Sequence, residues 1–199
     1  CMSIGSNKFT KKWWNEKETF EDFYSQFMDF YDKGLKFPND ISEEIFNKND
    51  DLREECFNHK LGLDDKNTGE LGTNSFHVIY HICEIVKPKN ILEIGFNRGN
   101  SALMWLYNSS ANLVSTDIID KPNSVEFINK LFPDRFTFLN LDSNNLHTKL
   151  QEWTDKFDLI FIDGDHSYEG MKLDTESCLK FNPKWLVFDD TYHPSHQND

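Results

Sequence analysis

The sequence contains few cysteines, and they are not arranged as metal ligands or as disulfide partners. Cys1, Cys56, Cys83 and Cys178 are far apart, and no CxxC pair occurs. A zinc site needs closely spaced ligands, and a disulfide framework is typical of small secreted domains rich in cysteine. The sequence therefore favours neither feature and indicates a reducing compartment, which we expect to be the cytoplasm.

Positive charge is also scarce. The chain has 21 Lys and Arg against 34 Asp and Glu, a formal net charge of -13. Such a field repels nucleic-acid phosphates and anionic membrane surfaces. No segment approaches the roughly 20 apolar residues that a membrane helix requires. We therefore expect neither a nucleic-acid partner nor a membrane partner.

The length fits one domain with a full core and a short extension, because the chain has 199 residues. It opens with Cys1 ahead of Met2 and closes with a polar run at 193–199, soon after a predicted strand. We therefore expect a fragment of a longer protein, truncated at the C-terminus.

Aromatic side chains recur at three- and four-residue steps between Phe20 and Tyr31, which predicts a helix that ends near Gly34. Pro38 interrupts the pattern, and a second helix is expected over about 41–52. The sequence thus predicts a helical extension over residues 1–72. Its aromatic stripe fits packing against the core, and the alternative is a lid over the substrate.

The pattern changes after residue 73, where short apolar runs alternate with helical periodicity. The predicted strands are 90–95, 112–117, 136–141, 158–163 and 184–189, and the predicted helices are 76–86, 101–108, 124–132, 145–153 and 168–180. Strand and helix in regular alternation indicate right-handed crossovers and a parallel sheet covered on both faces. Residues 73–199 are therefore expected to form an α/β, Rossmann-like doubly wound domain.

A glycine-containing turn follows the first of these strands. Gly95 permits a sharp turn, and Gly99 permits close approach of the backbone before the next helix begins. The first N–H groups of that helix can bind a negative group such as a carboxylate. Many crossovers need a glycine merely to turn, so this loop alone leaves a purely structural role open.

Acidic residues end the other strands. Asp117 is placed to accept the hydroxyls of a ribose, and Asp142 with Ser143 is placed to reach an adenine amino group. For both aspartates the alternative is an Asx turn or a cap.

Asp163, His166 and the pair Asp189 and Asp190 follow the last two predicted strands. The carboxyl ends of parallel strands lie at one edge of a sheet, so these side chains are expected to converge beside the glycine loop. Clustered carboxylates repel one another unless a cation intervenes, and oxygen ligands favour Mg²⁺.

From about residue 74 onward the sequence resembles the class I S-adenosylmethionine-dependent methyltransferases. The loop of Glu93, Gly95 and Gly99 has the ExGxxxG form of that family and lacks the middle glycine of GxGxxG dinucleotide loops. The segment IDGDHSYEGMKLD (162–174), followed by a strand that ends in two aspartates, resembles metal-dependent small-molecule O-methyltransferases, such as the sugar-type and cephalosporin-hydroxylase-like groups. The resemblance implies the strand order 3-2-1-4-5.

The resemblance also implies the roles of individual residues. Those implied to bind S-adenosylmethionine are Glu93, Gly95, Phe96, Asn97, Gly99, Ser101, Asp117, Ile118, Asp142, Ser143 and Asp163. Those implied to bind Mg²⁺ are Asp163, Asp189 and Asp190. Catalysis would rest on Asp163 and on His166, which would remove the proton of a small-molecule hydroxyl acceptor whose pKa the metal lowers.

The sequence departs from the family in two respects. Asp190 stands where catechol-type relatives usually have Asn, which favours the sugar-type branch. The final antiparallel hairpin of the family sheet is missing, so we expect either a truncated chain or an exposed edge at the fifth strand that a partner covers. An exposed edge and the aromatic stripe together favour a homo-oligomer.

Two other functions remain open from the sequence. One is an NAD-dependent oxidoreductase on a similar fold, against which the missing glycine and the acidic cluster argue. The other is a catalytically inactive cofactor-binding or scaffold module, which the missing strands would explain.

Overall fold

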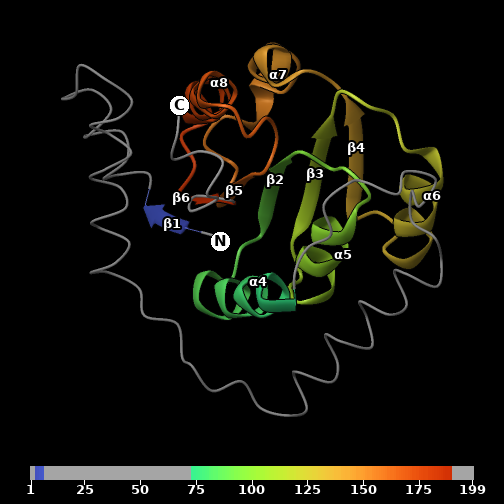
Figure 1. Ribbon diagram of the computed structural model, residues 1–199. Coiled ribbons are helices and arrows are strands. Elements are labelled where there is room, and N and C mark those ends of the chain that lie inside the picture. Colours follow the sequence, from blue (N-terminus) through green and yellow to red (C-terminus); the bar gives the residue numbers. More distant parts are fainter. Residues whose placement is uncertain (1–2, 7–72, 190–199) are drawn as a thin grey trace.

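The computed structural model describes residues 3–6 and 73–189, and these residues form one sheet flanked by helices (Figure 1). The sheet order is β1-β6-β5-β2-β3-β4. Its strands are β1 (Ser3–Ser6), β2 (Asn90–Ile94), β3 (Asn112–Asp117), β4 (Phe136–Asn140), β5 (Leu159–Ile162) and β6 (Trp185–Phe188). Strands β2 to β6 are mutually parallel, and their order β4-β3-β2-β5-β6 confirms the predicted 3-2-1-4-5 arrangement.

Helices cover both faces of the sheet. They are α4 (Thr73–Val86), α5 (Asn100–Tyr107), α6 (Pro122–Leu131), α7 (Leu146–Lys149) and α8 (Tyr168–Leu179), with two 3-10 turns, η1 (Ser143–Asn145) and η2 (Gln151–Trp153). Within residues 3–6 and 73–189, no helix combines the length and apolar character needed to cross a membrane.

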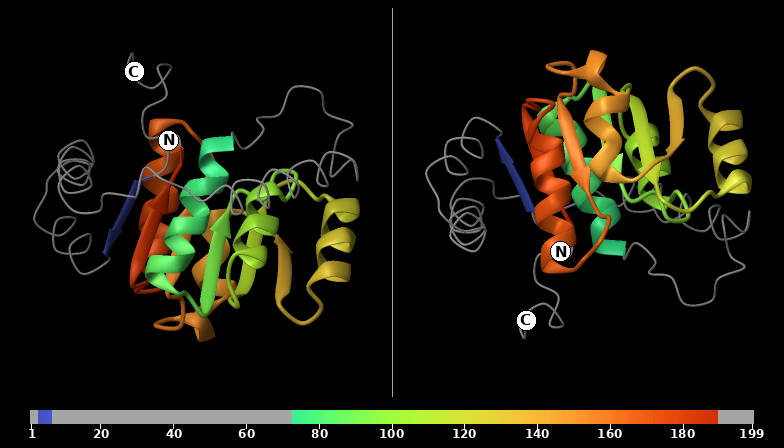
Figure 2. Two further views of the ribbon diagram at one scale, coloured as in Figure 1. Left: turned by 90° about the horizontal axis from the view of Figure 1, so that it is seen from below. Right: turned by 90° about the horizontal axis from the view of Figure 1, so that it is seen from above.

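The core is divided between these two faces. One buried cluster joins α4, α5 and α6 to alternate strand residues such as Ile91 and Phe161, and the other joins α7 and α8 to their neighbours Leu92 and Ile160. Figures 1 and 2 show α4 and α5 across the sheet from α7 and α8. Successive residues of a strand face opposite sides of the sheet, so a strand that is buried on both faces is apolar along its length. This apolar character made the strands predictable from the sequence.

The edge of β6 is covered by the chain itself. β1 pairs with β6 in antiparallel orientation, with Ser3 opposite Phe188 and Ser6 opposite Trp185. The expectation of an exposed edge at the fifth predicted strand is therefore wrong, because a strand from the start of the chain supplies its hydrogen-bonding partner. The helices expected near 20–34 and 41–52 lie outside the described residues.

The predicted helix over 145–153 is broken into η1, α7 and η2. Its buried residues Leu146 and Leu150 keep the helical spacing that led to the prediction. The segment also contains Asn145 and Thr148, whose low helix propensity does not sustain a continuous helix. Local propensity therefore prevailed over the apolar pattern here.

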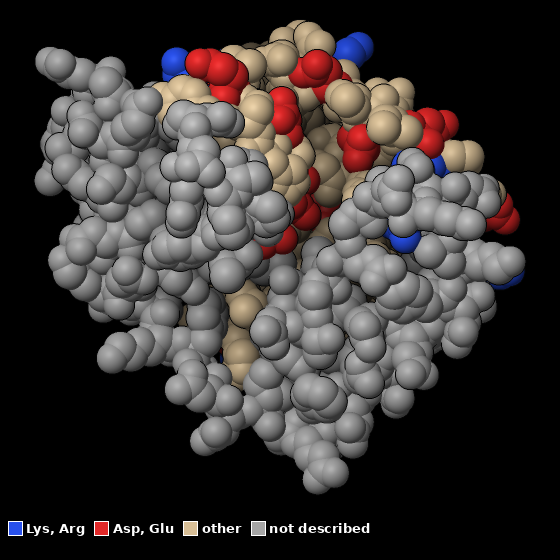
Figure 3. Space-filling model, viewed as in Figure 1, with Lys and Arg blue, Asp and Glu red and all other residues tan. Residues whose placement is uncertain are grey.

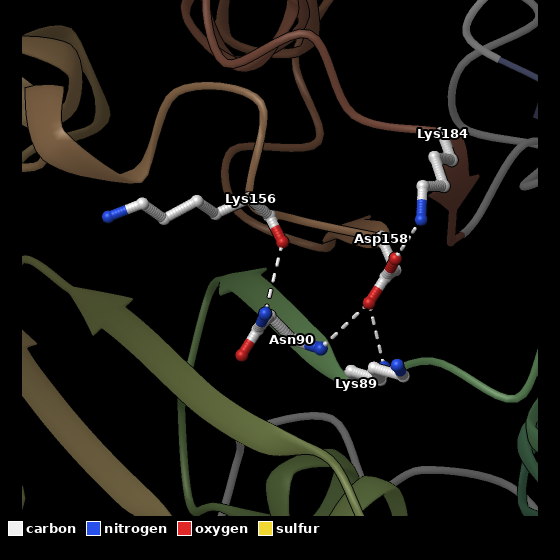
Figure 4. Close-up of polar contacts among 5 residues, drawn as sticks. All are labelled: Lys89, Asn90, Lys156, Asp158 and Lys184. Atoms are coloured by element: carbon white, nitrogen blue, oxygen red, sulfur yellow. Dashed lines mark hydrogen bonds and ion pairs between the residues drawn. The ribbon is translucent and has the colours of Figure 1, made fainter.

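Asp158 links residues at the amino-terminal ends of three strands (Figure 4). One carboxylate oxygen accepts hydrogen bonds from the backbone N–H groups of Lys89 (2.8 Å) and Asn90 (3.1 Å), and the other contacts Nζ of Lys184 at 2.6 Å. Burial raises the pKa of Asp158, but the hydrogen bonds from Lys184, Lys89 and Asn90 outweigh it and leave the pKa below its usual value. The carboxylate therefore joins the starts of β2, β5 and β6.

We expect Asp158→Ala to destabilise the fold by about 1–2 kcal/mol, because two backbone donors and one ammonium lose a charged acceptor but remain accessible to water. Urea unfolding measures the loss. Lys184→Ala is the control, and it should cost less than about 1 kcal/mol because Lys184 is an exposed partner. Equal losses in the two variants would contradict the dominant role of the backbone donors.

Candidate functional site

The carboxyl ends of three adjacent strands meet at one edge of the sheet. The N–H of Asp163 donates to the carbonyl of Ile94 (2.8 Å), and the N–H of Asp189 donates to the carbonyl of Ile162 (3.0 Å). Asp163 at the end of β5 thus lies between the glycine loop after β2 and Asp189 after β6. The structure brings these predicted site residues side by side.

Both glycines of the loop after β2 are required by the backbone conformation and by close contacts within the protein. Gly95 has a φ of +93°, and a Cβ there would lie 1.9 Å from the carbonyl oxygen of Asp163. Gly99 has a φ of +84°, and its Cβ would lie 2.8 Å from the ring of Phe96 and from Ile128. The close approaches are made to the protein itself, so the glycines shape the loop before any ligand binds.

The start of α5 provides a place for an anionic group. Gly99 is the N-cap residue of this helix and, as a glycine, has no side chain that could cap it. The first N–H groups of an uncapped helix, together with its positive dipole end, favour a carboxylate. The loop before it is held by Asp117, whose Oδ2 accepts the N–H of Asn97 at 2.7 Å.

Glu93 lies beneath this loop with its side chain fully buried. Its carboxyl oxygens accept hydrogen bonds from the hydroxyls of Ser101 (2.5 Å) and Ser115. Burial is the main cause that raises the pKa of Glu93 to about 7; the two serine hydrogen bonds lower it and the charge of Asp117 raises it. The hydrogen bond between Ser101 and Glu93 therefore joins the end of β2 to the start of α5 on the buried side of the loop.

Phe96 is also turned away from the surface. Its side chain is buried, and its ring centroid lies 5.7 Å from that of Phe136 and 4.9 Å from that of Phe138. Of the residues predicted for the cofactor, Glu93, Phe96 and Ser101 are thus buried at the base of the loop.

The buried acid predicts a pH-dependent stability. In the folded protein Glu93 holds its proton up to about pH 7, whereas it ordinarily titrates near 4.5. Between these values the unfolded chain has released the proton and the folded chain has not, so stability falls as pH rises through this window. Glu93→Gln lacks this titration, and we expect the difference in unfolding free energy between the two proteins to change by roughly 3 kcal/mol across it. Urea unfolding at successive pH values measures both curves, and parallel curves would refute the assignment.

Asp117 engages both of its oxygens within the chain. Besides the bond to Asn97, its Oδ1 accepts the N–H of Ile119 at 2.9 Å, which is an Asx turn. Each carboxylate oxygen has a second lone pair, so a ribose hydroxyl can still be accepted. The next side chain, Ile118, is 71% exposed and presents an apolar surface at this edge.

Asp142 also forms an Asx turn, which was the alternative to its predicted role in binding adenine. Its Oδ1 accepts the backbone N–H and the side-chain amide of Asn144, both at 2.8 Å. Asp142 is exposed, and Ser143 beside it is half-buried. Asp142 therefore forms the Asx turn through Oδ1, and neither bond from Asn144 uses Oδ2.

Asp163 and His166 form a pair above the end of β5. Nε2 of His166 lies 3.5 Å from Oδ1 of Asp163, and both side chains are partly exposed, at 39% and 19%. Asp189 is 8% exposed. These are hard oxygen donors together with an imidazole, a set suited to Mg²⁺ and to proton transfer.

The predicted metal site is only partly described. Asp163 and Asp189 are neighbours across β5 and β6, but Asp190 lies outside the described residues. Among residues 3–6 and 73–189, no three His, Cys, Asp or Glu side chains are grouped closely enough to hold a metal ion. A complete site would therefore need Asp190 or a ligand from the substrate.

The sequence did not point to Asp174, a buried carboxyl on α8 that lies next to Gly164. It also missed the reason for Gly164 and Gly170, which lie against Asp174 and Asp165. Helical spacing could have revealed it, because Gly170, Asp174 and Cys178 recur every four residues and share one buried face.

Comparison with known proteins identifies the family of the chain. The sequence model of a family described as a methyltransferase domain matches residues 92–191, half of the chain. The chain belongs to this family, and the order of its parallel strands is the one that the resemblance to class I S-adenosylmethionine-dependent methyltransferases implied. No curated protein sequence matches the chain.

Similar solved structures include a protein from Klebsiella pneumoniae provisionally described as an O-methyltransferase (19% identity, TM-score 0.49, covering 75% of this chain and 65% of that one). A second is a methyltransferase of Podospora anserina bound to S-adenosylhomocysteine (22%, 0.45, 73% and 69%). A third is the 1,6-didemethyltoxoflavin-N1-methyltransferase of Burkholderia thailandensis with bound 1,6-didemethyltoxoflavin and S-adenosylhomocysteine (15%, 0.47, 74% and 62%). The chain thus spans less than two thirds of the first and third proteins.

Proposed function

We propose that this protein transfers the methyl group of S-adenosylmethionine to a hydroxyl group of a small molecule. The observation that carries the proposal is the pair of Asp163 and His166, because the backbone of Asp163 packs directly against Gly95 of the glycine loop. A proton acceptor would then lie next to the proposed donor site.

The described residues would contact the donor at three of its groups. Its carboxylate would meet the N–H groups at the start of α5, and its ribose would be held by Asp117. Its adenine would lie between the exposed Ile118 and the turn at Asp142 and Ser143. When bound, the donor supplies an electrophilic methyl group on a sulfonium.

Asp163, Asp189 and Asp190 are the residues that would hold Mg²⁺. The ion would supply a lowered pKa for the acceptor hydroxyl. The tight packing of the Asp163 backbone against Gly95 fixes where the main chain of Asp163 lies relative to the proposed donor loop.

His166 acts as the general base in this proposal. Its imidazole takes the proton of the acceptor hydroxyl, and Asp163 orients the ring through the 3.5 Å contact. The acceptor oxygen then forms a bond to the methyl carbon as the carbon–sulfur bond breaks, and the electron pair remains on sulfur. Catalysis depends on holding the two reactants in line.

A small molecule is favoured as the acceptor over a nucleic acid. The net charge is -13, and acidic side chains outnumber basic ones on the described part of the face in Figure 3. A polyanionic acceptor would be repelled from such a surface.

Calorimetric titration with S-adenosylhomocysteine and with NAD, followed by transfer assays on a panel of hydroxyl compounds with and without Mg²⁺, tests the proposal. We expect binding of the first ligand alone and turnover that rises with Mg²⁺. Binding without any turnover would favour an inactive cofactor-binding module. Binding of NAD instead would favour an oxidoreductase and overturn the proposal.

A further inference from the structure

Glu93 places an acid inside the domain, at the base of the loop assigned above to the donor. Its side chain is fully buried, and the hydroxyls of Ser101 (2.5 Å) and Ser115 donate hydrogen bonds to its two carboxyl oxygens. Ser101 belongs to the first turn of α5, and Ser115 belongs to β3. A buried carboxylate without a cation costs stability, so stability alone does not explain why an acid lies here.

The surroundings of Glu93 oppose one another in their effect on its charge. Burial is the main cause that raises its pKa to about 7, the hydrogen bonds from Ser101 and Ser115 lower the pKa, and the charge of Asp117 raises it. The positive dipole end at the start of α5 also favours the carboxylate form. One additional charge nearby can therefore decide whether Glu93 keeps its proton.

The elements next to Glu93 contribute few other charges. Over their described lengths, β2, β5 and α5 contain no further Asp, Glu, Lys, Arg or His residue. Asp117 ends β3, and Arg98 lies in the glycine loop as a cation that does not titrate. Asp163 and His166 follow β5. Because imidazoles titrate near neutral pH, His166 is the neighbour whose charge an experiment must control for.

The donor and the product of the proposed reaction differ by one positive charge. S-adenosylmethionine carries a sulfonium where S-adenosylhomocysteine carries an uncharged thioether, and their amino acid and nucleoside parts are the same. A nearby cation favours the ionised form of a carboxyl, and by reciprocity the ionised carboxyl favours the ligand that carries the cation. A buried charge is weakly screened, so its field reaches a ligand that it does not touch.

We propose that Glu93 is a charge-sensing residue beneath the donor site, and that its negative charge favours binding of S-adenosylmethionine over S-adenosylhomocysteine. The inference rests on the proposed function. The Glu93 side chain is fully buried, so it acts through its charge rather than by contact with either ligand. The preference for the donor over the product is therefore strong when Glu93 is ionised and weak when it is protonated.

Calorimetric titration of the wild-type protein with each ligand, from about pH 5.5 to about pH 8.5, tests this preference across the titration of Glu93. We expect the dissociation constant of S-adenosylhomocysteine, divided by that of S-adenosylmethionine, to rise about fivefold over this range. The ratio cancels the titration of the groups that the two ligands share. Glu93→Gln has a similar size and no titrating group, so its ratio should stay constant. General loosening of the loop would weaken both ligands and leave the ratio unchanged.

A matched pair of hydroxyl variants tests whether the Glu93 carboxyl is the group that titrates. Ser115→Ala removes a hydrogen bond that lowers the pKa of Glu93, so the midpoint of the rise should move to higher pH. Thr116→Val is the control on the same strand, because the Thr116 hydroxyl donates to the main-chain carbonyl of Glu93 at 3.2 Å and not to its carboxyl. Its midpoint should stay in place. His166→Ala should keep the rise, which separates Glu93 from the neighbouring imidazole.

The outcomes separate this inference from the proposed function. If the wild-type protein binds neither ligand at any pH, the proposed function fails and the charge-sensing role fails with it. If both ligands bind but the ratio changes by less than about twofold, or if Glu93→Gln keeps the rise, only the charge-sensing role is overturned. Should Glu93→Gln not fold, the midpoint in Ser115→Ala relative to Thr116→Val decides: a shift supports the role of Glu93, and equal midpoints overturn it.

Discussion

Gly95→Ala is expected to destabilise the protein by about 4 kcal/mol or more and to abolish donor binding. The new Cβ would lie 1.9 Å from the carbonyl oxygen of Asp163 and 2.5 Å from its carbonyl carbon. Those are backbone atoms at the end of β5, fixed by the hydrogen bond from Asp163 to Ile94. Relief would require β2 to separate from β5 in the middle of the sheet, and alanine is also strained at a φ of +93°.

Gly99→Ala is the matched control for this experiment. Its φ of +84° imposes a similar backbone strain, but the atoms its Cβ would meet belong to the side chains of Phe96 and Ile128, which can shift. We therefore expect a smaller loss, about 2 kcal/mol, in urea unfolding. If the two variants were equally stable, contact with the backbone of Asp163 would not be the decisive constraint.

The parallel sheet was predictable because its strands are buried on both sides. Segments such as Asn90–Ile94 and Leu159–Ile162 are nearly continuous apolar runs, and each is followed by a polar turn. β1 carries no such signal. Its sequence is Ser-Ile-Gly-Ser, and its partner strand lies at the other end of the domain, with Ser6 opposite Trp185, so its pairing depends on long-range geometry that composition does not encode.

The sequence was enough to predict which carboxylates lie at the carboxyl ends of the strands. It was not enough to predict the contacts that each carboxylate makes there. Strand ends place Asp117, Asp142 and Asp163 at one edge by topology alone. Whether an oxygen is already occupied depends on loop conformation, as in the bonds of Asp117 to Asn97 and Ile119. The burial of Glu93 beneath the loop likewise follows from packing around Ser101 and Ser115, which no motif reports.

His166→Ala is expected to lower kcat by about 10²–10⁴ and to leave the dissociation constant for S-adenosylhomocysteine nearly unchanged. The imidazole is partly exposed above the end of β5 and contacts Asp163, whereas the predicted donor contacts lie on the glycine loop, Asp117 and the turn at 142–145. Loss of the base should therefore affect proton removal rather than binding of the donor. Stopped assays of methyl transfer at saturating donor measure kcat, and calorimetry measures binding.

His147→Ala is the control for losing an imidazole elsewhere, because the His147 ring packs on Phe181 at 5.4 Å and is not part of the proposed chemistry. It should retain kcat even if some stability is lost. Free imidazole added to His166→Ala should restore part of the rate, since a small base can enter the space that the side chain vacates, and it should not affect His147→Ala. Full turnover by His166→Ala would show that another group, or the solvent, takes the proton, and the role of His166 in the proposed function would then be wrong.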